Sequence, residues 1–293
     1  MSDPVIRRLV QWAEDREDIR AVLLTSSRAN PGAPMDIFSD YDIMFVVTDI
    51  RPYFDDRSYL NDYGSVLVVF KNPMGQDNGF NRFGDITHYE DGTKIDYLFY
   101  PVEWLQWVTQ QPELPPDLDL GYRVLLDKDH LTDDLKPPTH TAYIPSPPTD
   151  QMYQDLILEF WNDAAYTAKN LWRDNLISAK YNLDYIMKFQ VLRRFLEWLM
   201  EIEHHWSVRP GTYGKGLKKW IPPELWAEFE STYVGAGIEE NWEALFRTID
   251  LFRKVAIEVG LHLGFVYPHD LDRRMMIYLN KVRNLDPNAE SLR

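Results

Sequence analysis

Five prolines within thirteen residues divide this 293-residue chain into two parts of different character. They lie in the run KPPTHTAYIPSPP, from Lys136 to Pro148. Proline lacks a backbone donor and disfavours helix in the residue before it, so this run is predicted to be an extended linker. The sequence therefore predicts two domains, residues 1–135 and residues 149–293, joined by a linker over residues 136–148.

The first part mixes one amphipathic segment with several short apolar runs. Apolar side chains recur at helical spacing in residues 3–20, which predicts a helix. The runs predicted to be strands are Ala21–Leu24, Tyr41–Thr48, Ser65–Phe70 and Lys94–Phe99. Strands interspersed with helices indicate a mixed sheet flanked by helices.

The second part is dominated by helical periodicity. Thr149 and Asp150 are typical of a helix N-cap. The segments predicted to be helices are Tyr153–Trp172, Leu176–His204, Asn241–Leu261 and a shorter one opened by Pro222 and Pro223. The whole chain is thus expected to have an α+β fold, with a helical bundle as its second domain.

The net charge of −15 argues against a nucleic-acid-binding protein, because phosphate backbones need a basic surface. Residues 1–150 contain 26 Asp and Glu against 13 Lys and Arg, while the remaining residues contain 20 against 18. The acidic excess therefore lies in the first part. It serves either solubility or the attraction of a cation, which would be a metal ion or a polybasic small molecule.

The chain has no cysteine, which excludes disulfides and thiolate metal sites and fits a reducing compartment. Neither its first residues nor any later stretch has an apolar run long enough for a signal peptide or a membrane span. A cytoplasmic protein without a membrane partner is expected.

Three aspartates form the most informative pattern. Asp40 and Asp42 begin a predicted strand two residues apart, so their side chains point to the same face. Such a pair is unfavourable unless a cation lies between its members, and Mg²⁺ prefers oxygen ligands of this kind. Asp96 lies within another predicted strand, where a carboxylate is costly to bury unless it is paired or bound to metal. The alternative for Asp96 is a carboxylate at a strand edge or one in a salt bridge to an arginine.

The arrangement of strand, small-residue turn, Asp-x-Asp and distant strand Asp resembles the polymerase-β-like nucleotidyltransferases. The whole chain is also similar to the aminoglycoside 6-adenylyltransferase (streptomycin adenylyltransferase) family. The segments that carry this likeness include Thr25–Asn30, Phe38–Ile43, Glu90–Asp96, Val124–Asp129, Glu159–Trp161, Gly214-Lys215, Ser231–Tyr233 and Leu251–Lys254. One residue departs from the family pattern: Ser26 stands where the family turn has glycine, which adopts positive φ readily.

The resemblance implies a reaction in which AMP passes from ATP to a hydroxyl of a cationic aminoglycoside. Two Mg²⁺ ions would bridge Asp40, Asp42, Asp96 and the triphosphate. Ser26 and Ser27 would bind the terminal phosphates through backbone N–H groups and hydroxyls. Arg28 would either assist them or form a salt bridge.

The acceptor hydroxyl also needs a general base, and two carboxylates are candidates. Asp96 could serve while it binds metal. Glu159, on the first helix after the linker, is the other candidate. Asp163 lies four residues further along the same helical face, so the pair would either hold a cationic sugar or form a solvated acidic stripe.

Two lysines of the second part are candidates for nucleotide binding. Lys180 would either reach the triphosphate or pair with Asp184 four residues on. Lys215 lies in the basic, glycine-containing loop Tyr213–Lys219, which would either contact phosphate or cap a helix. The expected partners are therefore ATP and a streptomycin-like aminoglycoside. A different acceptor, or nucleotide binding without catalysis, is the alternative.

Overall fold

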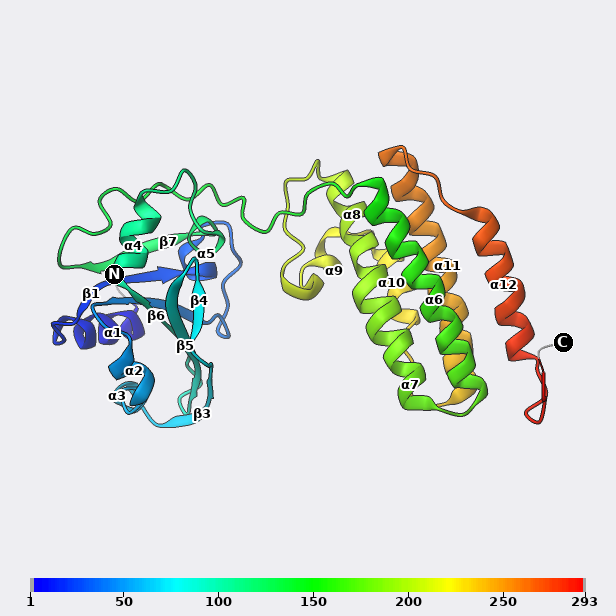
Figure 1. The fold of residues 1–293 in the computed structure, drawn as a ribbon, viewed down its shortest axis with the longest axis horizontal. Helices are drawn as coiled ribbons and strands as arrows, with labels where there is room; N and C mark the ends of the chain where they lie inside the picture. The colour runs from blue at the N-terminus through cyan, green and yellow to red at the C-terminus, as the bar shows by residue number, and fades with distance from the viewer. Residues whose placement is uncertain (1–2, 292–293) are drawn as a thin grey trace. The chain divides into compact units, whose positions relative to one another are not determined.

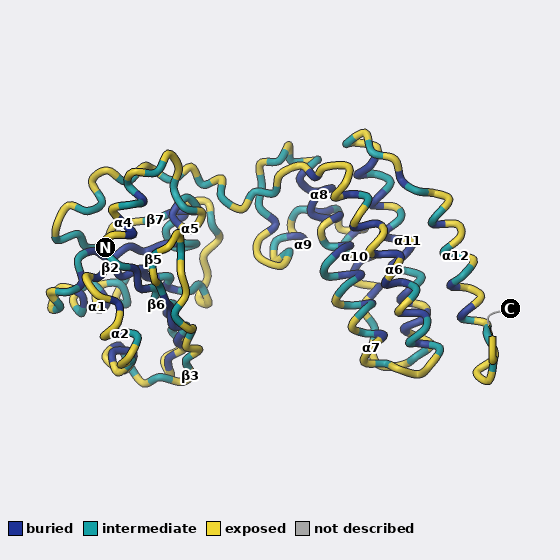
Figure 2. The backbone as a smooth tube through the Cα atoms, in the orientation of Figure 1, coloured by how far each residue is buried: buried dark blue, intermediate teal, exposed yellow. Residues whose placement is uncertain are grey.

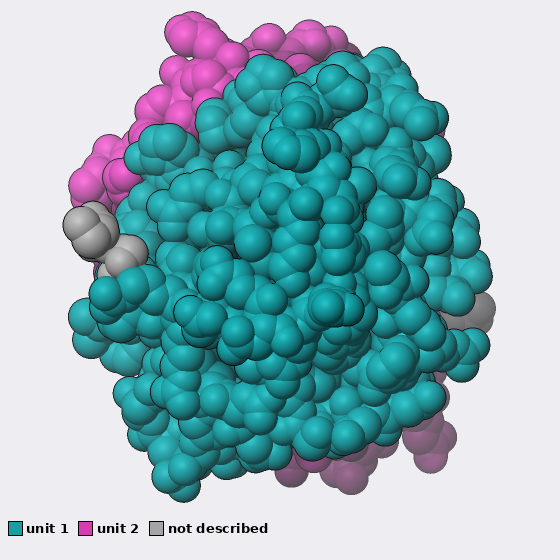
Figure 3. All heavy atoms as spheres, turned by 90° about the vertical axis from the view of Figure 1, so that its left-hand side faces the viewer, with its two compact units in different colours: residues 1–143 teal, residues 144–293 magenta. Residues whose placement is uncertain are grey.

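The computed structural model describes residues 3–291 and consists of two compact units, residues 1–143 and residues 144–293 (Figures 1 and 3). The boundary falls within the proline-rich run, where few side chains are buried. Each unit has its own hydrophobic core. The units are therefore described one at a time.

Unit 1 is built on a seven-stranded sheet, and the mixed sheet that the sequence predicts is confirmed. Its strands are β1 (Ile19–Thr25), β2 (Tyr41–Val47), β3 (Val66–Lys71), β4 (Gly75–Asp77), β5 (Phe80–Tyr89), β6 (Lys94–Pro101) and β7 (Tyr122–Asp127). Their order is β3-β5-β6-β2-β1-β7, with β4 paired to β5. Within residues 3–291, β2 and β6 run parallel and the other strand pairs are antiparallel.

The two faces of this sheet are covered by different helices. Successive residues of β2 point to opposite faces. Phe45 packs on the side of α1 (Pro4–Glu14), whereas Met44 packs on the side of α4 (Val102–Thr109). The short helices α2 (Arg51–Asp55) and α3 (Leu60–Tyr63) complete the first side, and α5 (Pro116–Asp119) completes the second. Figure 2 shows the central strands as the buried part of unit 1.

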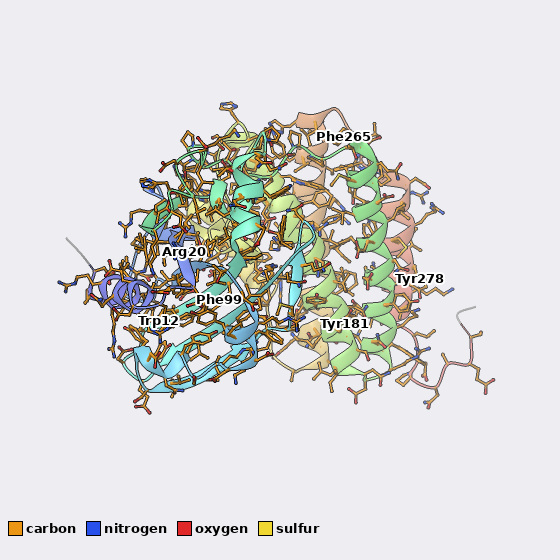
Figure 4. All side chains as sticks on the ribbon, turned by 60° about the vertical axis from the view of Figure 1, so that its left-hand side comes forward. Trp12, Arg20, Phe99, Tyr181, Phe265 and Tyr278 are labelled. Carbon is orange, nitrogen blue, oxygen red and sulfur yellow. The ribbon has the colours of Figure 1, made fainter. Side chains whose placement is uncertain are left out.

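The core on the α1 side is mainly aromatic. The ring of Phe45 lies 5.4 Å from that of Trp12 and 5.3 Å from that of Phe99. Trp12 and Phe99 are labelled in Figure 4. At the edge of this core the carboxylate of Asp85 is only 1% exposed. It accepts hydrogen bonds from Arg57 Nε at 3.0 Å and from the Tyr59 hydroxyl at 2.6 Å. These donors allow a charged residue to lie in the middle of β5.

Unit 2 is helical, and its long helices pack around one apolar core (Figure 1). Its helices are α6 (Asp150–Trp172), α7 (Leu176–Lys180), η2 (Tyr181–Leu192), α8 (Arg193–Glu203), α9 (Leu217–Trp220), α10 (Pro223–Ser231), α11 (Ile238–Leu263) and α12 (His269–Arg283), with the short turn η3 (Thr212–Gly214) before α9. Thr149 caps α6 by accepting a hydrogen bond from the Met152 amide, which confirms the predicted cap. In residues 3–291 no helix combines the length and the apolar character that crossing a bilayer requires.

Candidate active site

The three aspartates singled out from the sequence meet where β2 and β6 begin. In the parallel pairing of these strands, Asp42 lies directly opposite Asp96. Asp40 precedes β2 by one residue, two positions before Asp42. Alternation along the strand places Asp42 on the sheet face of Met44, which is the face covered by α4. The strand pairing thus brings together carboxylates from distant parts of the chain.

Lys94, a residue to which the sequence analysis gave no role, lies among these carboxylates. Its Nζ donates to Asp40 Oδ2 at 2.6 Å and to Asp96 Oδ2 at 3.1 Å. Its spacing provides the signal, because Lys94 lies two residues before Asp96 on one strand and therefore shares its face. Its ammonium stands between the carboxylates as a cation supplied by the chain itself.

One lysine does not balance three carboxylates. Burial, followed by the charges of Asp96 and Asp40, raises the pKa of Asp42 to about 6, against the lowering effects of Lys94 and of a hydrogen bond from the Ser26 hydroxyl. Burial also raises the pKa of Asp96, although its bond to Lys94 opposes the shift. The cluster therefore favours additional positive charge.

The donor set is chemically suited to Mg²⁺, a hard cation that prefers oxygen ligands. Asp96 Oδ1 is buried and receives no hydrogen bond, although it lies 3.1 Å from Lys94 Nζ. As the side chains stand, residues 3–291 contain no group of three His, Asp or Glu placed to bind a metal ion. Binding of a metal ion by these residues would therefore require Lys94 to move away.

The serine turn adjoins this cluster. Ser26 opens the short helical turn η1 (Ser26–Ala29) directly after β1, and its φ of 62° is in the left-handed region. This is the conformation for which the family glycine would be suited, and serine adopts it at some cost. Gly121 packs closely against this turn. A Cβ at position 121 would lie only 3.0 Å from the Ala29 carbonyl oxygen.

Arg28 is mostly buried and binds the segment that precedes β2. Its Nε donates to the Asp40 carbonyl oxygen at 2.9 Å and its Nη2 to the Ser39 carbonyl oxygen at 2.8 Å. Its guanidinium also lies 3.7 Å from the centre of the Tyr41 ring and pairs with Asp3. The sequence left two roles open for Arg28, phosphate binding or a salt bridge. This geometry favours the salt bridge, together with hydrogen bonds that fix the segment that carries Asp40.

The candidate base Glu159 lies in unit 2 and is exposed on α6, with no hydrogen bond or ion pair among the residues described. Asp163 behaves differently from the solvated stripe that the sequence suggested. It is buried, with 9% of its surface exposed, and its Oδ1 accepts a hydrogen bond from Asn182 Nδ2 at 2.6 Å. Asp163 therefore ties α6 to η2, and Glu159 is left as the accessible carboxylate of the pair.

The two candidate lysines of unit 2 also differ. Lys180 Nζ pairs with Asp184 at 2.6 Å and donates to the Val234 carbonyl oxygen at 3.0 Å, which is the helical salt bridge given as its alternative. Lys215 is exposed in the loop before α9 and has no ion pair within residues 3–291. Of the two, Lys215 has its ammonium group free for an anion.

A mixed sheet that places carboxylates at the start of two adjacent parallel strands, beside a serine turn, defines a nucleotidyltransferase domain. The family model described as "Streptomycin adenylyltransferase" matches residues 2–282. The chain belongs to this family, which confirms the resemblance, and it is a nucleotidyltransferase enzyme.

The chain is similar to individual relatives over most of its length. An aminoglycoside 6-adenylyltransferase of Campylobacter jejuni is 31% identical over 267 residues, covering 89% of this chain and 88% of that protein. A second, from Bacillus subtilis (strain 168), is 30% identical over 277 residues, covering 92% and 93%. The crystal structure of an aminoglycoside 6-adenyltransferase from Bacillus subtilis aligns over 96% of this chain and 98% of its own, at 26% identity and a TM-score of 0.48.

Proposed function

We propose that this enzyme transfers AMP from Mg-ATP to a hydroxyl of a streptomycin-like aminoglycoside and releases pyrophosphate. The observation that carries the proposal is the meeting of Asp40, Asp42 and Asp96 at the start of β2 and β6. Inactivation of the drug by this modification would confer antibiotic resistance. The absence of cysteine fits a reaction in the cytoplasm, where ATP is available.

Each group of the cluster has a role in this reaction. Asp40, Asp42 and Asp96 would hold Mg²⁺, which when bound stabilises charge on the attacking and leaving oxygens. The backbone N–H groups and hydroxyls of Ser26 and Ser27 bind the terminal phosphates. Arg28 acts indirectly, by holding the segment that carries Asp40.

The bond changes are those of an in-line displacement. The acceptor hydroxyl oxygen forms a bond to the α-phosphorus, and the bond from that phosphorus to the bridging oxygen breaks. The hydroxyl proton goes to Asp96 or Glu159. Lys215 and Lys180 are further candidates to bind the pyrophosphate group, and the free ammonium of Lys215 makes it the better one.

The charge of the chain supports a cationic acceptor. Residues 1–150 have twice as many acidic as basic side chains, 26 against 13, and a negative surface attracts polycations over a range set by salt. The names of the relatives point to the same class of acceptor.

The direct experiment is to incubate the protein with ATP, Mg²⁺ and a panel of aminoglycosides that includes streptomycin, and to measure pyrophosphate release. An uncharged oligosaccharide serves as control acceptor, and the Asp96→Asn variant as control enzyme. The proposal expects drug-dependent release by the wild type alone. Release that is no greater with any drug than with the uncharged sugar would refute it.

A further inference from the structure

A cavity of about 320 Å³ opens in unit 1 near the other end of β6 from Asp96. Tyr100 at the end of β6, Trp107 on α4 and the exposed Tyr143 form part of its wall. The β4–β5 hairpin contributes Asp77 and Arg82. This volume is at the lower end of the range for small-molecule sites.

Arg82 is the unusual group of this cavity. Its Nε is buried without a hydrogen-bond partner, and within residues 3–291 its guanidinium forms no ion pair. A buried donor that lacks an acceptor costs free energy, so a ligand that brings an oxygen acceptor would be favoured. Arginine has a fixed fork of donors that suits oxygen atoms.

Three carboxylates line the same space. Asp77 Oδ2 accepts from Trp104 Nε1 at 2.9 Å, and Asp117 Oδ1 accepts from the Tyr143 hydroxyl at 2.7 Å. Glu113 is exposed and has no hydrogen bond or ion pair among the residues described. With three carboxylates to one guanidinium, the lining repels a phosphate group and favours a cation.

The rest of the lining combines the polar side chains of Asn78 and Gln111 with aromatic and apolar ones. Tyr100, Trp107, Tyr143 and three neighbouring prolines present surfaces on which the carbon face of a ring can lie. A purely apolar ligand would leave Arg82 unpaired. The lining as a whole therefore suits a ring that carries cationic groups for the carboxylates and hydroxyls for the guanidinium.

We infer that this cavity binds one hydroxylated, cationic ring of the aminoglycoside acceptor, an inference that rests on the proposed function. Asp96, Leu98 and Tyr100 alternate along β6 and so share a sheet face, about 13 Å from first to last at the usual rise of a strand. Leu98, between the two, is only partly buried. A multi-ring drug held in the cavity can therefore extend along this face toward the aspartates, whereas a single sugar cannot.

The test uses Arg82→Gln and Glu113→Gln, which remove the two charged groups of the cavity lining that have no ion pair within residues 3–291. Matched controls are Arg51→Gln on α2 and Glu103→Gln on α4, two exposed residues outside the cavity lining. Both test variants are expected to raise the KM for streptomycin about tenfold, as for loss of a charged hydrogen bond, with kcat and the KM for ATP unchanged. The controls should match the wild type.

Streptomycin binding measured by calorimetry without ATP separates the two proposals. The Kd of both test variants should also rise about tenfold over that of the wild type. A KM and Kd equal to those of the controls would overturn the cavity assignment and leave the proposed reaction standing. If the wild type released no pyrophosphate with any drug, the proposed function would fail. In that case, streptomycin binding by the wild type that is lost in Arg82→Gln would still support the cavity assignment. If the wild type bound no streptomycin in the calorimeter, the cavity assignment would be overturned.

Discussion

Lys94 Nζ lies 2.6 Å from Asp40 Oδ2, so the ammonium of one strand neutralises a carboxylate at the start of its neighbour. The same ammonium contacts Asp96, and Asp42 lies opposite Asp96 in the strand pairing. A metal ion shared by these carboxylates would compete with Lys94 for the same oxygens. Lys94 thus stabilises the metal-free protein at the expense of metal affinity.

This competition predicts two effects of Lys94→Met. Without metal, the variant should lose about 2 kcal/mol of stability, because the carboxylates lose a charged hydrogen-bond donor. Its affinity for Mn²⁺ in the absence of nucleotide, measured by electron paramagnetic resonance, should rise about tenfold, a gain of about 1.4 kcal/mol. Added Mg²⁺ should then recover the lost stability. Lys71→Met, on exposed β3, removes an equal charge from the same sheet and serves as control; matching behaviour of the two variants would contradict the prediction.

Asp42→Asn should separate stability from activity. Since the pKa of Asp42 is about 6 in the folded protein, above the value of about 3.9 in an unfolded chain, the folded state binds the proton more tightly. The contribution of Asp42 to the stability of the metal-free protein should therefore fall as pH rises from about 4 to 6 and then level off.

The asparagine variant lacks this loss, so at pH 8 without metal it should melt at a higher temperature than the wild type. Its kcat should nevertheless fall at least about a thousandfold, because a metal ligand is missing. Thermal melts across pH, paired with pyrophosphate release, check both statements. A variant that melts below the wild type at pH 8 would show that the Asp42 charge is well compensated.

Ser26 can be tested with two substitutions that differ in backbone freedom. Both remove the hydroxyl that donates to Asp42, but glycine also relieves the left-handed conformation, which costs a non-glycine residue about 1 kcal/mol. Urea unfolding should thus find Ser26→Gly more stable than Ser26→Ala by roughly that amount. Ser26→Gly should also have a lower KM for ATP than Ser26→Ala, because both variants lack the hydroxyl and glycine alone lets the backbone approach a phosphate more closely. Equal stabilities would show that the turn is unstrained in solution.

Glu159→Gln distinguishes a base from a drug anchor. If Glu159 is the base, Glu159→Gln should lower kcat about 10²–10⁴-fold and remove one limb of the pH profile of kcat. As an anchor, its loss would raise the KM for the drug and leave kcat nearly constant. Glu239→Gln, an acidic residue in the first turn of α11, provides a control in the same unit. Constants equal to the wild type would leave Asp96 as the remaining candidate.

The buried carboxylate of β5 predicts a purely structural effect. Asp85→Asn removes the negative partner of Arg57, which is itself mostly buried. Breaking a buried ion pair from one side costs about 3–5 kcal/mol, so unit 1 should unfold at a markedly lower temperature or denaturant concentration. Calorimetry on the full-length protein measures this. A loss of stability below about 1 kcal/mol would show that this ion pair contributes no more than an exposed one, contrary to the prediction.

The strands and helices that could be predicted from the sequence were those whose apolar pattern is uninterrupted. β2 matches its predicted range to within one residue, and α6 begins at its predicted cap. β5 was not predicted, because Asp85 interrupts its pattern and becomes tolerable only through Arg57 and Tyr59 far along the chain.

Helix α12 was missed for a similar reason. It buries Asp272, whose Oδ1 accepts from Arg253 Nη2 at 2.8 Å and whose Oδ2 accepts from the Tyr267 hydroxyl at 2.9 Å. Buried charges of this kind cannot be recognised until their partners are known.

Some residues of the candidate site could likewise be predicted from the sequence, and others could not. The spacing of Asp40 and Asp42 predicts a shared face, and the register of β2 against β6 adds Asp96 to it. The spacing of Lys94 and Asp96 places both on one face, but it does not reveal that Lys94 also binds Asp40. The partners of Arg28 cannot be found from spacing at all. Its hydrogen-bond acceptors include backbone carbonyls, which a sequence pattern does not reveal.

The parallel pairing of β2 with β6 has a consequence for synthesis on the ribosome. Lys94 and Asp40 are 54 positions apart, and β6 also pairs with β5, which is made before it. A nascent chain that has exposed β2 but not β6 carries Asp40 and Asp42 without their counter-ion and without the third carboxylate. The third carboxylate and the competing ammonium therefore join the cluster together, when β6 emerges and inserts between β5 and β2.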